Sequence, residues 1–139
     1  MSLSWQYIAG FTDGEGCIRI NSNHRYGCSP KIAIAQSGAR GLDVLTKIRL
    51  WLLEQDIPSN FDIQEPTKLS KLTLYRLTIT KRETATKFLE GVLPYLIVKK
   101  VEAEDLLRHL KIFPALPKGG KLTWESRRAN FKENKECLQ

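Results

Sequence analysis

The sequence contains few cysteines and histidines, and this scarcity excludes several classes of protein. Its 139 residues include three cysteines and two histidines. Cys17, Cys28 and Cys137 are odd in number and lack a Cys-x-x-Cys spacing, so we interpret them as reduced thiols rather than as a disulfide framework. Together with His24, Cys17 and Cys28 would supply only three irregularly spaced ligands, so we do not expect a zinc site.

Long apolar runs are also missing. The longest nearly uncharged stretch covers residues 91–98, far short of the roughly 20 residues that a helix needs to cross a bilayer. The N-terminus does not show the basic and then apolar pattern of a signal peptide, and it carries Asp13 and Glu15. We therefore expect no membrane span and an intracellular protein, in the cytoplasm or in an organelle.

The chain does have the composition of a globular domain with excess positive charge. It is 42% hydrophobic and 27% charged, with a formal net charge of +7, which favours one domain with its own core. Most of the excess falls in residues 66–100, where basic residues outnumber two glutamates: Lys68, Lys71, Arg76, Lys81, Arg82, Lys87, Lys99 and Lys100. Such a concentration suits a polyanionic partner, although a solvated basic surface would look the same.

Hydrophobic periodicity predicts eight elements in the order α-β-β-α-β-β-α-α. The predicted helices cover residues 3–11, 42–54, 80–90 and 99–113, and the predicted strands cover residues 17–21, 31–35, 61–64 and 73–79. The third helix should begin at the capping box Thr80–Glu83 and stop at Gly91. We place the domain at residues 1–113, followed by a tail of residues 114–139 with a last helix from Thr123.

This order predicts an α+β fold with a four-stranded antiparallel sheet, helices on one face and the other face open. Ile18, Ile20, Ile32 and Ile34 alternate onto the covered face. The opposite positions are polar and basic, and a β-ribbon with such side chains can read base edges in the major groove. An ordinary solvated sheet face remains the alternative. The predicted DNA-binding residues, loops included, are Arg19, Asn21, Asn23, His24, Arg25, Ser29, Lys31, Ala33, Asp62, Gln64, Lys68, Lys71, Arg76 and Thr78.

The turn after the first helix contains two carboxylates, Asp13 and Glu15, at the negative end of the helix dipole, where acids are disfavoured by up to about 1 kcal/mol. Gly10 within that helix costs roughly 1 kcal/mol relative to alanine unless another backbone approaches there. Close packing of two such helices, with the acids beside a bound cation, would explain both features. Mg²⁺ prefers carboxylate and phosphate oxygens, which points to phosphodiester chemistry. A glycine-rich cap with solvated acids remains possible.

The stretch Ile8-Ala9-Gly10-Phe11-Thr12-Asp13-Gly14-Glu15-Gly16 resembles the signature of the LAGLIDADG homing endonucleases. Ile34-Ala35-Gln36 with Arg40 and Leu42 resembles the family's second strand and second helix. Phe88–Leu96 followed by Lys99 resembles the region of its active-site lysine. The resemblance covers roughly residues 3–112 and implies the αββαββα fold of that family.

The resemblance also implies roles for individual residues. Glu15 matches the metal-binding acid, with the Gly14 carbonyl beside it, and Asp13 matches the first acid, which supports the turn and the helix interface. The residues that would order water and stabilise charge at the scissile phosphate are Gln36, Arg40 and Lys99, although Arg40 and Lys99 could also be ordinary surface residues. The implied cofactor is Mg²⁺, with Mn²⁺ as a substitute and Ca²⁺ supporting binding without cleavage.

A single motif per chain implies a homodimer, because cutting both strands of a duplex needs two active sites. A two-fold dimer would bring the two Glu15 residues together and would recognise a pseudo-palindromic site of about 20 bp. The resemblance implies cleavage across the minor groove with short 3′ overhangs. A maturase that binds intron RNA and a DNA-binding relative that does not cleave remain alternatives, and no small-molecule substrate is expected. The predicted dimer residues are Tyr7, Ala9, Gly10, Thr12 and Asp13.

Overall fold

The protein is described by a computed structural model covering residues 3–23, 27–69 and 71–112. The elements are α1 (Trp5–Glu15), β1 (Gly16–Asn23), β2 (Gly27–Ser37), α2 (Gly38–Glu54), β3 (Asn60–Gln64), β4 (Leu74–Ile79), α3 (Arg82–Val92), the short 3₁₀ helix η1 (Leu93–Tyr95) and α4 (Lys100–Ile112). The predicted order of helices and strands is confirmed. The predictions for His24, Arg25 and the tail, including a helix from Thr123, lie outside the described residues.

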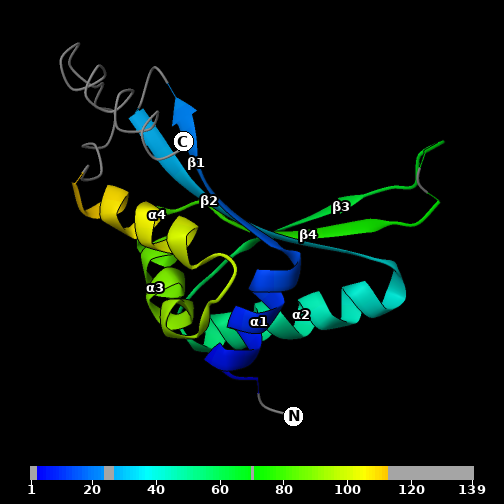
Figure 1. The fold of residues 1–139 in the computed structure, drawn as a ribbon. Coiled ribbons are helices and arrows are strands. Elements are labelled where there is room, and N and C mark those ends of the chain that lie inside the picture. Colours follow the sequence, from blue (N-terminus) through cyan, green and yellow to red (C-terminus); the bar gives the residue numbers. More distant parts are fainter. Residues whose placement is uncertain (1–2, 24–26, 70, 113–139) are drawn as a thin grey trace.

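The four strands form one antiparallel sheet in the order β1-β2-β4-β3. The helices pack on one side of this sheet and leave the other side open, as predicted (Figure 1). Residue Ile32 in β2 lies between Ile18 in β1 and Ile79 in β4. This register places apolar side chains in a row beneath the helices, so the alternation along each strand separates a core face from an open face.

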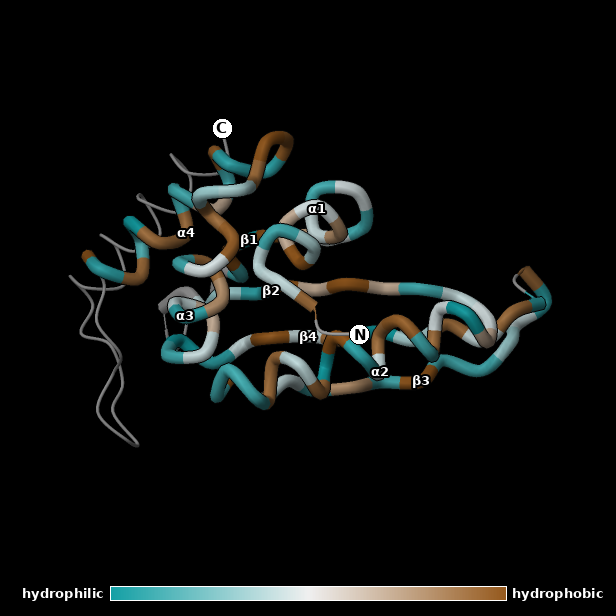
Figure 2. Tube along the Cα trace, turned by 90° about the horizontal axis from the view of Figure 1, so that it is seen from below, coloured by the Kyte–Doolittle hydropathy of each residue, from teal (hydrophilic) through white to brown (hydrophobic). Residues whose placement is uncertain are grey.

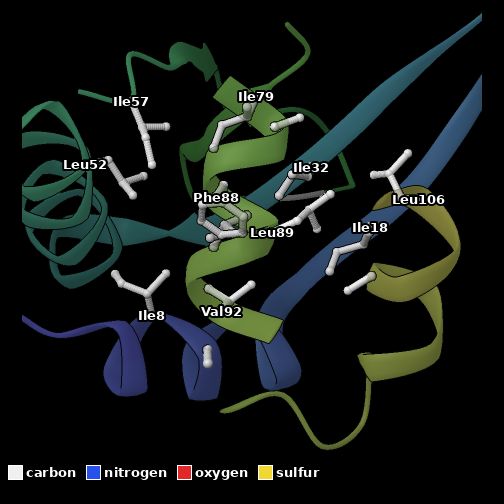
Figure 3. Close-up of a cluster of buried hydrophobic side chains, with 14 of the residues drawn as sticks. Ile8, Ile18, Ile32, Leu52, Ile57, Ile79, Phe88, Leu89, Val92 and Leu106 are labelled. Carbon is white, nitrogen blue, oxygen red and sulfur yellow. The ribbon is translucent and has the colours of Figure 1, made fainter. Parts of the chain in front are cut away.

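The core lies between the sheet and α1, α2, α3 and α4 (Figure 3). The four isoleucines predicted to face the helices are all buried. The Phe88 side chain of α3 is fully buried at the centre and meets the Trp5 ring of α1 edge to face, with 6.2 Å between the ring centroids. Trp5 makes a second such contact with Trp51 of α2 at 5.0 Å. One aromatic side chain thus joins three helices.

The start of α3 differs from the prediction. Lys81 is the residue before the first helical turn, and no side chain caps it. The hydroxyl of Thr84 donates to the Lys81 carbonyl at 3.1 Å, so the Thr80–Glu83 capping box was wrong. Figure 2 shows both polar and apolar residues along α3, and the buried side of the helix determines its position more than a local cap does.

Two other helix boundaries also differ from the prediction. Helix α3 continues through Gly91 to Val92. The Trp5 ring occupies the space beside Gly91, where a Cβ atom would lie 2.5 Å from the ring. Helix α2 begins at Gly38, and its buried side carries Gly41 rather than Leu42, which is exposed. Close packing, not helix propensity, explains both glycines. Among the helices of the described residues, none is long and apolar enough to cross a bilayer.

Candidate active site and nucleic-acid interface

The acidic turn joins α1 directly to β1. A Cβ atom at Gly16 would lie 2.8 Å from the Thr12 carbonyl oxygen, so only glycine allows the chain to leave the helix this tightly. Glu15 is the last residue of α1, and both Gly14 and Glu15 are exposed. Within the described part of the chain, Glu15 forms no ion pair. Its carboxylate is therefore open to a ligand from outside the protomer.

The neighbouring acid, Asp13, binds its own chain. Its carboxylate accepts backbone hydrogen bonds from three consecutive residues, Ile97 at 2.8 Å, Val98 at 3.1 Å and Lys99 at 2.9 Å. These residues lead into α4, whose N-terminus favours a nearby negative charge. The sequence resemblance indicated support of the turn, but it did not reveal this contact across more than 80 residues. No local pattern could have revealed it.

Lys99 is held at the same place by a second contact. Its ammonium group donates to the main-chain carbonyl of Asp13 at 2.6 Å. That carbonyl belongs to the last turn of α1, where unpaired carbonyls and the helix dipole attract a cation. The structure therefore places Lys99 beside the turn that carries Glu15, as the predicted site requires. Asp13 fixes the lysine through both its side chain and its backbone.

Gln36 reaches the same end of the sheet from β2. Gly16 at the start of β1 pairs with Ile34, so Gln36 lies just beyond the end of the β1 ladder, on the side of the helices. A Cβ atom at Gly41 would lie 2.8 Å from the Gln36 Cβ atom, so the first turn of α2 packs directly on this half-buried glutamine. The tight entry into α2 uses Gly38 at a φ of +77°.

Arg40 is exposed in the first turn of α2, and in the described part of the chain it has neither a hydrogen bond nor an ion pair. The structure thus brings Glu15, Gln36 and Lys99 to one end of the fold and leaves Arg40 nearby on the surface. No group of three or more acids, histidines or cysteines that could hold a metal ion occurs among the described residues.

A single protomer offers a divalent cation one free carboxylate and the Gly14 carbonyl. Mg²⁺ is commonly bound by one or two carboxylates, with phosphate oxygens and water completing its octahedral shell. The donor set of Glu15 and Gly14 fits that pattern only when a second chain and a nucleic acid supply the remaining oxygens. The fit is therefore conditional on the dimer.

The open face of the sheet presents polar side chains in rows. Arg19 lies opposite Lys31, Asn21 opposite Ser29, and Asp62 opposite Arg76. The charged members of these rows are exposed or half-buried, as are Gln64 in β3 and Ala33 in β2. Lys68 and Lys71 are exposed in the connection between β3 and β4, whereas Asn23 is placed only by its backbone pairing with Gly27. The structure thus places these residues on the open face and in the connection beside it, and their contact with DNA stays a prediction.

Thr78 is an exception, because its side chain is only 7% exposed. It lies in register between Ala33 and Asn60. Thr78 therefore offers less surface than the other residues of the open face, and its contact with DNA stays a prediction.

The basic residues of segment 66–100 divide between the two sides of the molecule. Arg76 lies on the open face, but Arg82 donates to the Leu110 carbonyl at 3.0 Å, and Lys87 forms an ion pair with Asp56 at 3.1 Å. Both contacts belong to the helical layer. Only part of the positive charge therefore faces a partner on the sheet.

The predicted dimer surface on α1 also needs correction. Ala9 and Thr12 are fully buried within their own chain, and the Thr12 hydroxyl donates to the Ile8 carbonyl at 2.7 Å. Tyr7 and Gly10 remain exposed, and a Cβ atom at Gly10 or Gly14 would meet nothing within 4 Å. The free side of α1 therefore carries Tyr7, Gly10 and Gly14. Their spacing of three and four residues is the signal that could have identified Gly14.

An acid-bearing helix turn at one end of an open antiparallel sheet defines the class of protein: the fold is that of the LAGLIDADG homing endonucleases. The family described as a LAGLIDADG-like domain matches residues 3–92. The chain belongs to this family. No curated protein sequence matches it significantly.

Solved structures support the same fold. The homing endonuclease I-CvuI, bound to DNA with magnesium and with the DNA not cleaved, is 20% identical with a TM-score of 0.62, and the match covers 97% of this chain and 94% of that chain. In a complex of I-CvuI with its target in the presence of calcium, the match spans 65% of that chain. The archaeal intron-encoded I-Vdi141I, bound to DNA, is 19% identical with a TM-score of 0.63 and coverage of 96% and 81%.

The match to a longer relative covers a smaller share of that relative's chain. I-GzeII, in complex with its DNA target, is 16% identical with a TM-score of 0.64. The match covers 98% of this chain but only 44% of I-GzeII. The chain therefore spans less than half of the I-GzeII chain and nearly all of the I-CvuI chain in the magnesium complex.

Proposed function

We propose that the protein is a site-specific DNA endonuclease that acts as a homodimer and cuts both strands of a long pseudo-palindromic site. The observation that carries this proposal is the exposed Glu15 at the end of α1, with Lys99 held beside it by Asp13. An acid kept free of partners and next to an ordered lysine suits phosphodiester hydrolysis. The DNA-bound relatives of this fold support the choice of substrate.

DNA would lie along the open face of the sheet. Arg19, Lys31 and Arg76 project from three neighbouring strands, and such side chains contact phosphates and base edges in the major groove. Each sheet would follow about one helical turn of DNA, so two sheets would cover about 20 bp. Phosphate contacts of this kind make the affinity fall steeply with salt concentration.

At the ends of the two α1 helices, the Glu15 carboxylate and the Gly14 carbonyl would hold Mg²⁺, with Mn²⁺ able to replace it and Ca²⁺ supporting binding only. The ion would supply activation of water and neutralisation of charge at the phosphate. Gln36 has an amide that can orient the attacking water, and the Lys99 ammonium group can offset negative charge that develops on the phosphate oxygens. Arg40 would contact a neighbouring phosphate. Cleavage across the minor groove would leave short 3′ overhangs.

Replacement of Glu15 tests the proposal most directly. Glu15→Gln should reduce cleavage of a selected site by more than about 100-fold while the Kd for DNA changes little, because the amide keeps the shape but loses the charge. The matched control is Glu54→Gln, since Glu54 is also exposed at the last position of a helix. The site itself would come from selection of cleaved sequences in a randomised duplex library with Mg²⁺.

The possible results separate the candidate functions. Cleavage retained by Glu15→Gln would overturn the assignment of the metal-binding acid. Sequence-specific DNA binding without cleavage by the unaltered protein would instead identify a DNA-binding relative. Preference for a structured RNA over duplex DNA would identify a maturase.

A further inference from the structure

A small cavity lies at the edge of the sheet, where β3 begins and β4 ends. Its volume is about 50 Å³, enough for a few water molecules or for one tetrahedral oxyanion in their place. The cavity reaches the surface, because several of its lining residues are exposed. Its polar lining residues, called the edge pocket below, are Ser59, Asn60, Thr78, Thr80, Lys81 and Thr84. The edge pocket shares no described residue with the acidic turn or with the predicted catalytic residues.

The Ser59 hydroxyl lacks a hydrogen-bond partner in this pocket. Its oxygen atom is buried, and no polar atom of residues 3–23, 27–69 and 71–112 bonds to it. The hydroxyl of Thr84, in contrast, donates to the Lys81 carbonyl at 3.1 Å. A buried hydroxyl without a partner destabilises a fold. An acceptor that enters the pocket from outside would satisfy Ser59, so the unpaired hydroxyl indicates a ligand.

The electrostatics of the edge pocket favour an anion. Lys81 and Thr84 line it from the start of α3, whose N-cap residue makes no side-chain capping bond, and the unpaired amides of a first helical turn attract negative charge. The exposed ammonium group of Lys81 adds a full positive charge, because it forms no ion pair within the described part of the chain. Glu83 is exposed in the same turn, but no carboxylate is among the described lining residues.

The edge pocket also borders the open face of the sheet. Asn60 pairs with Thr78, two positions along the strands from the pair Asp62 and Arg76, and side chains two positions apart share one face. The open face proposed to contact DNA therefore extends to the pocket. Thr84, on the opposite wall, belongs to the helical layer, so the two layers meet here beside the edge strand β3.

We propose that the edge pocket binds one phosphate group, with the Ser59 hydroxyl and the first amides of α3 as donors and the Lys81 ammonium group as the counter-charge. The inference rests on the proposed function, because in the complex this phosphate belongs to the backbone of the bound duplex. Inorganic phosphate offers the same oxygens and should enter the same pocket of the free protein. A phosphate held at the sheet edge would fix the register of the duplex relative to the side chains that read bases.

The first test uses inorganic phosphate and the full chain without DNA. The melting temperature should rise in phosphate relative to chloride at equal ionic strength, and the rise should saturate, because the anion binds the folded state. Ser59→Ala and Lys81→Gln should each weaken the apparent affinity for phosphate by at least about threefold. The matched control is Lys47→Gln, at an exposed lysine of α2 outside the pocket, which should keep the full response.

The stability of Ser59→Ala without phosphate separates a ligand site from a structural one. Its melting temperature should equal or exceed that of the unaltered protein, since the substitution removes a buried hydroxyl that bonds to no described residue. A clear loss of stability would mean that the hydroxyl supports the fold through a resident water, and this result would overturn the proposal.

The second test places single methylphosphonate linkages, which lack the phosphate charge, along the selected duplex. The affinity of the unaltered protein should fall about three- to tenfold at one position in each half-site, and Ser59→Ala and Lys81→Gln should lose a similar amount on the unmodified duplex. At that position the variants should lose nothing further, because the contact is already absent. Lys47→Gln should behave as the unaltered protein at every position.

The outcomes separate this inference from the proposed function. Variants that match the unaltered protein in both tests would overturn the phosphate site and leave the endonuclease proposal standing. A phosphate response that is lost in the variants, with unchanged affinity for every duplex, would overturn the DNA backbone as the source of the phosphate. An unaltered protein that responds to phosphate but binds no duplex would overturn the proposed function and support the phosphate site alone.

Discussion

The two faces of the sheet differ in almost every property although the same strands build both. On the helical side, Ile32 and Ile34 of β2 are fully buried. On the open side, the intervening Lys31 and Ala33 are only half-buried, and Lys31 lies opposite the exposed Arg19. The alternation of side chains along a strand allows one sequence to supply stability on one face and recognition on the other.

Because the two faces carry different side chains, we expect stability and binding to be separable in this fold. Removal of side chains from the core face should lower the free energy of unfolding, whereas removal from the open face should leave it nearly unchanged and lower affinity for DNA. The acidic turn and α1 lie at the border of the two faces, so substitutions there should affect both properties.

The largest difference in the free energy of unfolding is expected between substitutions at two neighbouring residues of β2. Ile32→Ala should lower the free energy of unfolding by about 2–5 kcal/mol, because it removes three buried carbon atoms and leaves a cavity between Ile18 and Ile79. Lys31→Ala should change it by less than about 0.5 kcal/mol. Urea unfolding measures both. Equal decreases in the free energy of unfolding would mean that the open face also contributes to stability.

Substitution of alanine for two helical glycines should change the stability of the protein in opposite directions. Gly91→Ala should destabilise the protein by about 1–3 kcal/mol, since the new methyl group would overlap the Trp5 ring. Gly10→Ala meets only open space within the chain and should stabilise the protomer by about 1 kcal/mol through helix propensity. The same change should weaken self-association. Tighter association of Gly10→Ala would contradict a close approach of two α1 helices.

Asp13→Ala should lower stability by about 1–2 kcal/mol, because three amides at the start of α4 lose their acceptor. The cleavage rate should fall at least about tenfold while the Kd for DNA stays within about twofold, since Lys99 loses its support. Asp13→Asn is the control, because its amide oxygen can still accept. Unchanged cleavage by Asp13→Ala would show that Lys99 is positioned in another way.

Two basic residues of segment 66–100 should differ in DNA binding. Arg76→Ala removes an exposed side chain of the open face and should cost about 1 kcal/mol of affinity, and it should reduce the salt dependence by about one phosphate contact. Lys87→Ala breaks an exposed ion pair with Asp56 in the helical layer and should leave the affinity unchanged. Titrations at several salt concentrations measure both. Equal effects would place DNA away from the sheet.

Local patterns were sufficient for the fold and for part of the site. Alternation identified the buried isoleucines, and the residues around Glu15 identified the acidic turn, because both signals come from consecutive positions. The start of α3 and the role of Gly91 were missed, because the Trp5 ring and the buried face of α3 decide them through contacts distant in sequence. The bonds from Asp13 to Ile97 and Lys99 were missed for the same reason.

Burial explains the other differences between the predicted and the observed site. Ala9 looked suitable for a close contact between two helices because it is small, but its place on the helix turns it into its own core. Thr78 alternates onto the open face, yet its side chain is only 7% exposed. Periodicity predicts the direction of a side chain, whereas exposure depends on the neighbours that the fold brings alongside.

The smallest expected change in stability concerns Glu15, at the border of the two faces. An acid at the C-terminal end of a helix opposes the helix dipole, so Glu15→Gln should raise the free energy of unfolding by a few tenths of a kcal/mol, up to about 0.5 kcal/mol, even though it removes cleavage. Denaturation in low-salt buffer without divalent ions measures the effect, and Glu54→Gln, at the corresponding position of α2, should give a similar increase. A loss of stability in Glu15→Gln alone would mean that the carboxylate supports the turn, whereas equal gains in the two variants would mean that the fold does not need this carboxylate.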